Sequence, residues 1–368
     1  MQEIKQPETV NAVAVHSERR RGRGAHANVS GRFERESRHD TDDGWASLDD
    51  LAPFATTVGI DAARTIITTN RSPDISFDQS INPYRGCEHG CIYCYARPSH
   101  CYLGLSAGLD FESQLFAKPN AAELLERELA RPSYKPKVIA LGANTDPYQP
   151  IERTWRISRE ILQVLATARH PVGIVTKSAL VTRDIDILAP MARDGLVKVA
   201  LSVTTLDRMT ARKMEPRAST PDKRLQAIRE LSEAGIPTAV MVAPIIPAIN
   251  DSEIEAILAA ARDAGASEAG YVLLRLPLEI KELFHSWLAD QYPDRAERVI
   301  SILRCMRGGK DYDARWFERQ KGTGPYAELI AQRFRLALRR LALNERKYRL
   351  RTDLFTRPVI RGGQLALF

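Results

Sequence analysis

The sequence predicts an α/β protein with a buried parallel sheet, arranged as a full or partial (β/α) barrel or as a doubly wound sheet. Three observations predict this class. Short apolar runs recur between about residues 64 and 276, stretches with helical spacing separate them, and the runs are continuous rather than alternating. About six such strand–helix repeats follow one another. In any of these architectures, functional side chains belong on the loops after the carboxyl ends of the strands.

Each predicted strand after the first is a short run rich in Val, Ile, Leu and Ala. The first lies around residues 80–85, and the others lie at residues 138–142, 172–176, 197–203, 238–243 and 271–276. After the last strand, residues 279–305 and 326–343 have helical spacing. The second of these predicted helices carries, opposite its apolar face, Arg333, Arg335, Arg339 and Arg340.

Composition divides the chain into four parts. They are a flexible Arg/Gly-rich arm at residues 1–50, the barrel at 64–280, a basic helical region at 281–350 and a tail at 351–368. The arm lacks apolar periodicity, so it is expected to bury too little surface to offset its ordering entropy. Phe33 and Trp45 could still anchor it onto the folded body.

Basic residues are in excess only at the end of the chain. The 368 residues include 53 Lys+Arg and 46 Asp+Glu. Residues 301–368 hold 16 basic and 6 acidic side chains, so the rest of the chain is close to neutral. This asymmetry predicts a polyanionic partner, a nucleic acid bound through residues 301–361. A solvated Arg-rich face would have the same composition.

The composition also excludes several classes of protein. With 44% hydrophobic and 27% charged residues the chain is not disordered as a whole, and five cysteines are too few for a disulfide scaffold. The longest uncharged apolar stretch, residues 235–250, is interrupted by prolines and too short to span a bilayer. The N-terminus has no apolar segment of a secretory signal. We therefore expect a cytoplasmic protein with no membrane partner.

Three of the five cysteines form a compact loop directly after the first predicted strand. Cys87, Cys91 and Cys94 have the spacing C-x3-C-x2-C, and Gly86 and Gly90 permit tight turns between them. Three thiolates on so short a loop can converge on one soft metal centre. A set of three suits a [4Fe–4S] cluster in which one iron stays open to another ligand.

Two other interpretations of this loop remain open at this point. A structural zinc site could use His89 or His100 as its fourth ligand, although such sites usually contain paired C-x2-C elements. The three cysteines could also be buried free thiols, but their clustering argues against this.

The loop, with Tyr93 before its last cysteine and a βα scaffold downstream, resembles the radical S-adenosylmethionine (SAM) superfamily. The longer string at residues 82–97, N-P-Y-R-G-C-E-H-G-C-I-Y-C-Y-A-R, is similar to the spore photoproduct lyase-like branch, and the match covers about residues 64–280. The resemblance implies a partial (β/α)6 TIM-like barrel, with the cluster loop at its mouth, an N-terminal arm and a C-terminal helical extension. It also implies that SAM chelates the open iron and is cleaved reductively to a radical that abstracts a hydrogen from the substrate.

The resemblance further implies where SAM is held. Polar groups after the second barrel strand stand where the superfamily binds the amino group of SAM, and a lysine after the third strand faces its carboxylate. A hydroxyl after the fourth strand suits the ribose of SAM. An apolar edge after the fifth strand suits its adenine. The residues implied are Tyr93, Asn144, Thr145, Asp146, Lys177, Ser178, Ser202 and Ile245. A Ser or Thr at a strand end is often only a turn or N-cap residue.

The chain departs from the branch in one respect. Spore photoproduct lyase uses a cysteine as hydrogen donor in the loop after the second barrel strand, and residues 142–146 contain none. The candidates left for a catalytic role are Cys101, Cys305 and Glu215. Each has an ordinary alternative, because a lone cysteine is usually a buried small hydrophobe and a loop carboxylate is usually solvated.

The chain ends in Gln364-Leu365-Ala366-Leu367-Phe368, which resembles the peptide by which bacterial replication and repair proteins dock on the β sliding clamp. In such a peptide, Leu and Phe fill an apolar groove and Gln bonds at its rim. The alternative is a terminal apolar segment that folds back onto the body.

The sequence thus predicts a radical SAM enzyme that acts on a nucleic acid and is reduced by an electron donor such as flavodoxin or ferredoxin. One alternative is a radical SAM enzyme that acts on a protein or small molecule. Another is a non-enzymatic iron–sulfur or zinc protein that binds DNA or the clamp.

Overall fold

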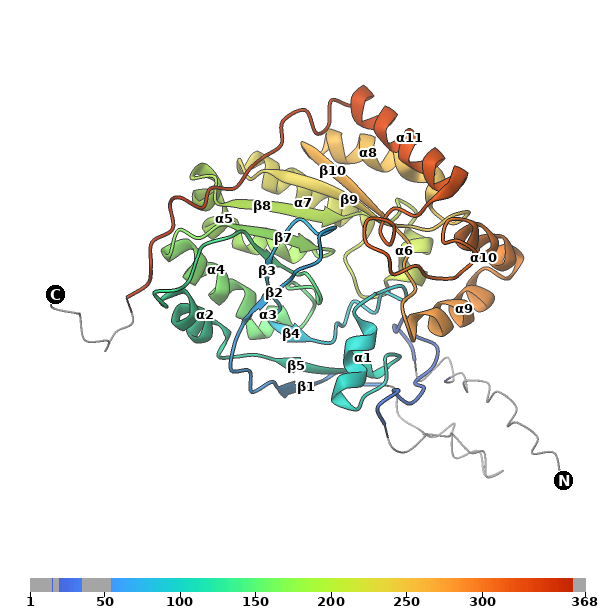
Figure 1. Cartoon of the computed structure of the whole chain (residues 1–368), viewed down its shortest axis with the longest axis horizontal. Helices are drawn as coiled ribbons and strands as arrows, with labels where there is room; N and C mark the ends of the chain where they lie inside the picture. The colour runs from blue at the N-terminus through green and yellow to red at the C-terminus, as the bar shows by residue number, and fades with distance from the viewer. Residues whose placement is uncertain (1–14, 16–19, 35–53, 360–368) are drawn as a thin grey trace.

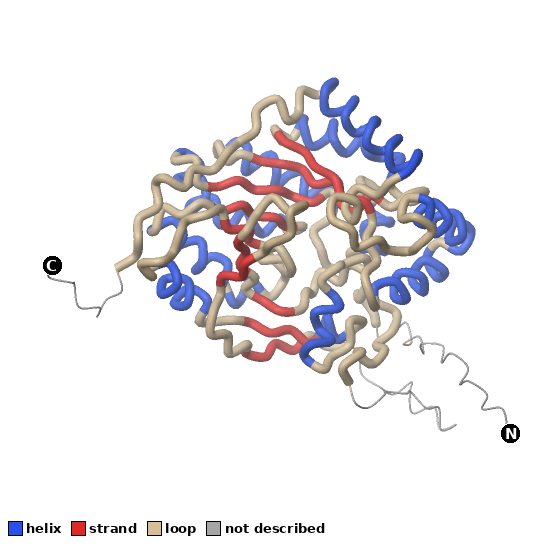
Figure 2. Tube along the Cα trace, in the orientation of Figure 1, coloured by secondary structure: helices blue, strands red, loops and turns tan. Residues whose placement is uncertain are grey.

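The computed structural model describes residue 15, residues 20–34 and residues 54–359. Its main sheet has the strand order β10-β9-β8-β7-β6-β3-β2. These strands are β2 (Ile67–Thr69), β3 (Gln79–Ile81), β6 (Ile139–Leu141), β7 (Val172–Thr176), β8 (Val197–Ser202), β9 (Thr238–Ile245) and β10 (Glu268–Leu273). Strands β3 and β6 to β10 are parallel and follow the chain order, and β2 pairs antiparallel with β3. The sheet confirms the α/β class and the partial (β/α)6 barrel (Figures 1 and 2).

A helix connects each barrel strand to the next. The connecting helices are α2 (Ala121–Leu129), α4 (Ile157–Thr167), α5 (Ile185–Arg193), α7 (Pro221–Glu233) and α8 (Ile254–Asp263). Short elements precede several of them: α3 (Glu152–Trp155), η2 (Ala179–Asp184), α6 (Arg208–Met214) and η3 (Asp251–Glu253). The apolar faces of the helices pack on the sheet, because the strands are apolar on both sides: all of β6 and nearly all of β8 are buried.

Two strand predictions differ from the structure. The run predicted at residues 80–85 is divided into β3 and β4 (Tyr84–Arg85), because Pro83 has no N–H to donate and the Asn82 side chain accepts the N–H groups of the β6 loop. The run predicted at residues 271–276 begins at Glu268 instead. Its polar start is paired, since Glu268 binds Lys198 and the Asn344 side chain bonds the edge of β10.

A second, smaller sheet supports the cysteine loop. It has the order β1-β5-β4 and consists of β1 (Thr57–Ile60), β4 and β5 (Gln114–Ala117). Between β4 and β5 the chain forms the cysteine loop, then η1 (Arg97–Leu103) and α1 (Asp110–Ser113). The loop is therefore fixed at both ends, by a strand before it and a helical turn after it.

The helices predicted after the barrel are present. They are α9 (Ile280–Gln291), η4 (Pro293–Arg295), α10 (Ala296–Cys305) and α11 (Gly324–Arg340). Pro293 marks the break between α9 and α10, as expected for a residue that cannot continue a helix. Among the described helices, none is both long and apolar enough to cross a membrane.

The chain after α11 lies across the amino ends of the barrel strands. Backbone N–H groups of Asn344, Arg351 and Thr356 donate to the carbonyls of Ser267, Gly195 and Ala168. These three acceptors precede β10, β8 and β7, and Figure 1 shows the red segment passing the starting ends of these arrows. The segment is thus at the end of the sheet opposite the loops that follow the strands.

The two edges of the open sheet are joined by loops. The backbone N–H of Leu273, the last residue of β10, donates to the Gln320 carbonyl (2.8 Å). Next to it, Arg319 Nε donates to Asp74 Oδ2 (2.7 Å) in the loop between β2 and β3. No strand pairing joins β10 to β2 within the described residues.

Part of the expected arm is packed onto the body. Residues 20–34 contact the cysteine loop and α9, and the ring of Phe33 lies 5.1 Å from that of Tyr102. Trp45 and the clamp-like peptide, Gln364–Phe368, lie outside the described residues, so the predictions made on them stay predictions.

Candidate functional site

The three cysteines predicted to hold a cluster are brought together at the carboxyl end of the barrel. Glycines at positions 86 and 90 take φ values of 73° and 66°, which allow the loop to turn around the thiols. The Cys87 N–H donates to the Phe111 carbonyl (2.9 Å) and the Ile92 N–H to the Met214 carbonyl (3.0 Å). The loop is thereby bonded to α1 on one side and to α6 on the other.

All three thiols are shielded from solvent. Cys87 and Cys91 are buried and Cys94 is half-buried. Burial raises the pKa of each thiol above its usual value, to about 12 for Cys91. The thiolate is the form that binds metal, so metal binding at this site releases the thiol protons. The bound metal then compensates the negative charge of the buried thiolates.

The donor set fits an iron–sulfur cluster. Within the described residues, no three Cys, His, Asp or Glu side chains meet closely enough to hold a single metal ion. In a [4Fe–4S] cluster each thiolate binds a different iron, so the three sulfurs need not meet at one point. The two histidines weighed as zinc ligands have other partners: His89 Nδ1 lies 3.3 Å from Asp146, and His100 Nε2 lies 2.8 Å from the Gln114 carbonyl.

Asp146 organises the loops after β6 and β7. Its carboxylate accepts hydrogen bonds from the Thr176 hydroxyl (2.7 Å), the Lys177 N–H (2.8 Å) and the Tyr148 N–H (2.9 Å), and it also faces His89. Burial disfavours its charge, but the attraction of His89 and these hydrogen bonds lower the pKa of Asp146 to about 2. Asp146 is therefore ionised, and most of its acceptor capacity is directed at its own chain.

Tyr93, Glu215 and Arg224 form a buried polar chain beside Cys91. The Tyr93 hydroxyl donates to Glu215, whose other oxygen accepts from Arg224. The Glu215 and Arg224 side chains are 0% and 2% exposed. Burial alone would raise the pKa of Glu215, but Arg224 and Lys177 attract its charge and lower the pKa below the usual value. Glu215 is thus a buried, paired carboxylate and not the solvated loop residue weighed as its alternative.

Lys177 is another cation close to this site. Its Nζ lies 5.7 Å from the centre of the Tyr93 ring. Its charge also lowers the pKa of Cys91 and of Cys94, against the larger effect of burial. Lys177 is therefore placed to compensate negative charge at the cysteine loop or on a ligand beside it.

The other residues predicted to contact SAM have varied surroundings. The Thr145 hydroxyl donates to the Tyr84 carbonyl, and the Ser178 hydroxyl caps η2 by accepting the Leu180 N–H (3.2 Å). Asn144 is exposed and Ser202 is buried. Ile245 is 0% exposed, so its side chain has no free surface in this conformation. The contacts proposed for these residues stay predictions.

The two remaining cysteines are in different environments. Cys101 is buried in η1, where its Sγ lies close to the backbone of Gly31, and Cys305 is exposed at the end of α10. No role in hydrogen donation follows from either position.

A buried ion pair that the sequence did not indicate holds the cysteine loop. Arg97 and Glu112 are both 0% exposed and bind each other. Arg97 also donates to the carbonyl of Cys91 (2.9 Å), while Glu112 accepts the N–H groups of Gly24 and Ala25 (2.8 Å each). The pair therefore joins the cysteine loop to the N-terminal segment.

The N-terminal segment approaches the cysteine loop so closely that only glycine fits. A Cβ at position 24 would lie 1.7 Å from the Gly90 carbonyl oxygen. The Arg-Gly-Arg-Gly string at residues 21–24, first interpreted as a flexible arm, is thus partly a contact surface. Its alternating glycines were the signal for close backbone approach.

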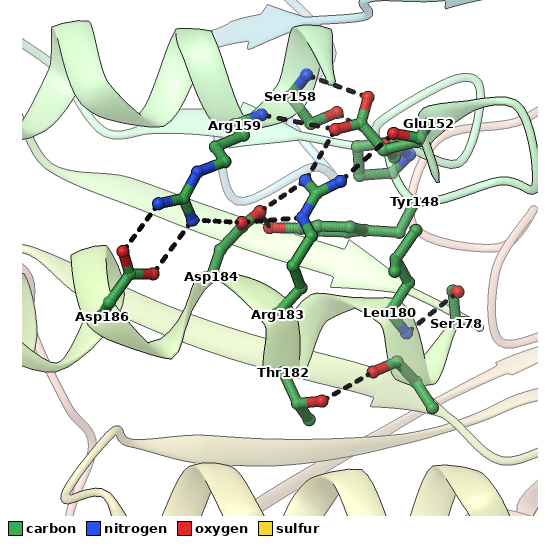
Figure 3. Close-up of polar contacts among 12 residues, drawn as sticks. Tyr148, Glu152, Ser158, Arg159, Ser178, Leu180, Thr182, Arg183, Asp184 and Asp186 are labelled. Atoms are coloured by element: carbon green, nitrogen blue, oxygen red, sulfur yellow. Dashed lines mark hydrogen bonds and ion pairs between the residues drawn. The ribbon is translucent and has the colours of Figure 1, made fainter. Parts of the chain in front are cut away.

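A second polar network joins the loops after β6 and β7 (Figure 3). Arg183 lies between Glu152 and Asp184, with 2.8 Å from its Nη2 to an oxygen of each. Tyr148, which follows Asp146 by two residues, donates its hydroxyl to Asp184 (3.1 Å). Because both carboxylates are fully buried and paired, they hold α3 and η2 in a fixed relation to each other.

One family model and several uncharacterized relatives match this chain. The model of the radical SAM superfamily matches residues 81–261. An uncharacterized protein of Mycobacterium tuberculosis is 37% identical over 232 residues, which cover 62% of this chain and 68% of that protein. An uncharacterized protein of Methanocaldococcus jannaschii is 28% identical over 227 residues, which cover 62% of this chain and 81% of that protein.

Solved structures share the fold. Spore photoproduct lyase complexed with dinucleoside spore photoproduct has a TM-score of 0.52 at 16% sequence identity, over 77% of this chain and 78% of that one. A C140A/S76C mutant of the same lyase with bound AdoMet and dinucleoside spore photoproduct has a TM-score of 0.50 over the same shares. At this identity the likeness shows a common fold.

The close approach of residue 24 can be tested by hydrogen exchange. Gly24→Ala should speed exchange of the Ala25 amide about tenfold or more, because overpacking by a methyl group costs about 1–3 kcal/mol and the segment must lift. Gly173→Ala is the matched control, since its Cβ would meet only Val138 Cγ1, at 4.0 Å. Equal exchange rates in the two variants would contradict the packing described.

The Glu215–Arg224 pair can be tested by unfolding in denaturant without added cofactors. Arg224→Met should lower the free energy of unfolding by about 3–5 kcal/mol, because it leaves a buried carboxylate without its partner. Adding Glu215→Gln should restore most of the loss. A single variant within about 1 kcal/mol of the wild type would show that the pair is not buried as described.

Proposed function

The chain belongs to the radical SAM superfamily, and from this premise we propose that it cleaves SAM at a cluster held by Cys87, Cys91 and Cys94 to begin hydrogen abstraction on a nucleic-acid substrate. Membership makes the protein an enzyme whose cofactors are a [4Fe–4S] cluster and SAM. When bound, these groups supply reductive cleavage of SAM and the radical that abstracts hydrogen.

One observation carries the proposal: the three thiols lie on one loop at the carboxyl ends of the parallel strands, beside Lys177. The residues of this chain then have distinct tasks. Lys177 would pair with the SAM carboxylate. Asp146 positions Lys177 by accepting its backbone N–H. Arg97 keeps the loop closed through the Cys91 carbonyl. Burial of the thiols excludes water from the site.

Glu215 is best explained as a positioning residue. Glu215 accepts a hydrogen bond from Tyr93 and is itself held by Arg224. It therefore fixes the ring of Tyr93, which lies between Cys91 and Cys94 in the sequence. A group bound on both sides in this way has little capacity left to contact SAM or substrate. Tyr93 then provides the ring face over which Lys177 lies.

The nucleic-acid substrate is supported by charge and by fold. The last 68 residues carry the basic excess, and the solved lyase with a bound dinucleoside photoproduct has the same fold at 16% identity. The charge is divided among three places, however: residues 307–321, helix α11 and residues 344–357. Residues 344–357 lie at the amino ends of the strands, away from the cysteine loop, while residues 307–321 lie at the carboxyl end. We therefore assign contact with the reacting nucleic acid to the latter.

The protein also requires an electron donor, for which we propose flavodoxin or ferredoxin. A sliding clamp bound through the terminal peptide stays a prediction.

The ligand assignment predicts that Cys87→Ala, Cys91→Ala and Cys94→Ala each abolish cluster loading, because two thiolates alone do not hold the cluster. Iron and sulfide content and visible absorption after anaerobic reconstitution measure this. Cys305→Ala is the control and should load normally, since this cysteine is exposed and outside the loop. A normal chromophore in any of the three loop variants would overturn the assignment.

The reconstituted wild type should form 5′-deoxyadenosine from SAM when a reductant is added. An intact cluster without this product would overturn the proposed reaction. Binding of a labelled oligonucleotide should weaken steeply with salt, because counterions are released from the phosphates. Absence of binding, or binding independent of salt, would instead count against the nucleic-acid substrate alone.

A further inference from the structure

The segment between α10 and α11 forms a cavity of about 430 Å³. The cavity is lined by Arg307, Gly308, Lys310, Tyr312, Asp313, Ala314 and Arg315. Arg307 fixes its wall to the barrel: its two Nη atoms donate to the carbonyls of Leu274 and Glu318 (2.8 Å each). Because Leu274 directly follows β10, the cavity lies at the end of the sheet where the chemistry is placed.

Arg275 connects this cavity to the cluster loop. It follows β10 by two residues, and its guanidinium lies 6.0 Å from the ring of Tyr312 and 5.3 Å from the ring of Tyr95. Tyr95 comes directly after Cys94, and its hydroxyl donates to the Ala143 carbonyl in the loop after β6. A group bound at Arg275 is therefore one side chain away from the cluster loop.

Two guanidinium groups, Arg307 in the lining and Arg275 beside it, form no ion pair among the described residues. The buried Nε of each also has no hydrogen-bond partner. Burial and the nearby Arg275 lower the pKa of Arg307 to about 10. Asp313 is the carboxylate of the lining, and Arg315 already binds both of its oxygens. Lys310 is exposed. An anion would relieve the repulsion between the two guanidinium groups.

Two exposed aromatic residues follow the cavity directly. Trp316 and Phe317 are 58% and 64% exposed, which is unusual for side chains of this size. Their backbone is nevertheless fixed, because the Phe317 N–H and the Arg319 side chain both bind Asp74 across the open edge of the barrel. Phe317 has a φ of 67°, a conformation that non-glycine residues adopt mainly where the surrounding structure imposes it.

We propose that this cavity and the neighbouring Arg275 bind two adjacent phosphates of single-stranded nucleic acid, one at Lys310 and one at Arg275, and that Trp316 and Phe317 stack on its bases. Arg307 holds the wall of the cavity in place, and its positive charge attracts the phosphates. The combination of a cationic pocket with adjacent exposed rings is what a single strand requires, because its phosphates need charge and its unpaired bases need flat apolar partners. The proposal rests on the nucleic-acid substrate proposed above and names the residues that bind it.

The test compares two double variants of the reconstituted full chain. Arg275→Gln/Lys310→Gln removes two positive charges at the cavity, and Arg346→Gln/Lys347→Gln removes two exposed ones at the opposite end of the barrel. The probe is a fluorescein-labelled oligothymidine of about 20 nucleotides. The cavity variant should bind about tenfold more weakly and lower the salt slope by about 1.4, since each lost single-strand phosphate contact contributes about 0.7. The opposite-end variant should bind like the wild type.

Two further variants separate the contributions. Lys310→Gln alone, at an exposed position that cannot disturb the fold, should lower the slope by about 0.7. Trp316→Ala should weaken binding with the slope unchanged, because stacking releases no counterions. Equal losses in the two double variants would overturn the cavity site, since affinity would then follow total charge.

Titration with thymidine 5′-monophosphate and with inorganic phosphate distinguishes the sources of the phosphate. Binding of oligothymidine that the cavity variant weakens supports the whole proposal. Binding of the monophosphate or phosphate alone, weakened by the same variant, would keep the phosphate pocket and overturn the nucleic-acid substrate. Oligothymidine binding that the cavity variant leaves unchanged would overturn this inference while leaving the proposed function intact.

Discussion

The buried pair Arg97–Glu112 is the interaction on which the arrangement of the site depends. Two charges without solvent are stable only when every remaining donor and acceptor is satisfied. Here Arg97 also bonds the carbonyls of Cys91, Ala107 and Gly108, and Glu112 accepts two N–H groups of the N-terminal segment. The pair thereby fixes the cysteine loop, the turn before α1 and a segment more than 80 residues away in sequence.

The parallel sheet gives the molecule two different ends. All loops that follow the barrel strands gather at one end, with the cysteine loop, Asp146 and Lys177 among them. The basic segment after α11 lies at the other end and bonds the turns before the strands. Charge that is contiguous in the sequence is therefore separated in space, and only part of it can act on a substrate at the reacting end.

Buried charges at the reacting end are paired in ways that also set its shape. Glu215 is held between Tyr93 and Arg224, and Glu152 and Asp184 are held by Arg183, which joins the loops after β6 and β7. Such satisfied networks favour one conformation, because any shift leaves a charge without a partner in a low-dielectric interior. The guanidinium groups near the cavity lack this compensation, which is why their surroundings point to a ligand and not to a structural role alone.

The sequence by itself determined the α/β class, the six parallel strands and the cysteine loop, because continuous apolar runs and the C-x3-C-x2-C spacing are local patterns. It predicted β7 at its observed bounds and placed β10 three residues late, since the polar start of β10 is paired by residues from other parts of the chain. Only the tertiary structure decided that Arg97 meets Glu112, that Arg224 meets Glu215 and that residues 20–34 cover the cysteine loop. These contacts join distant segments, and no local periodicity encodes a partner that arrives from another element.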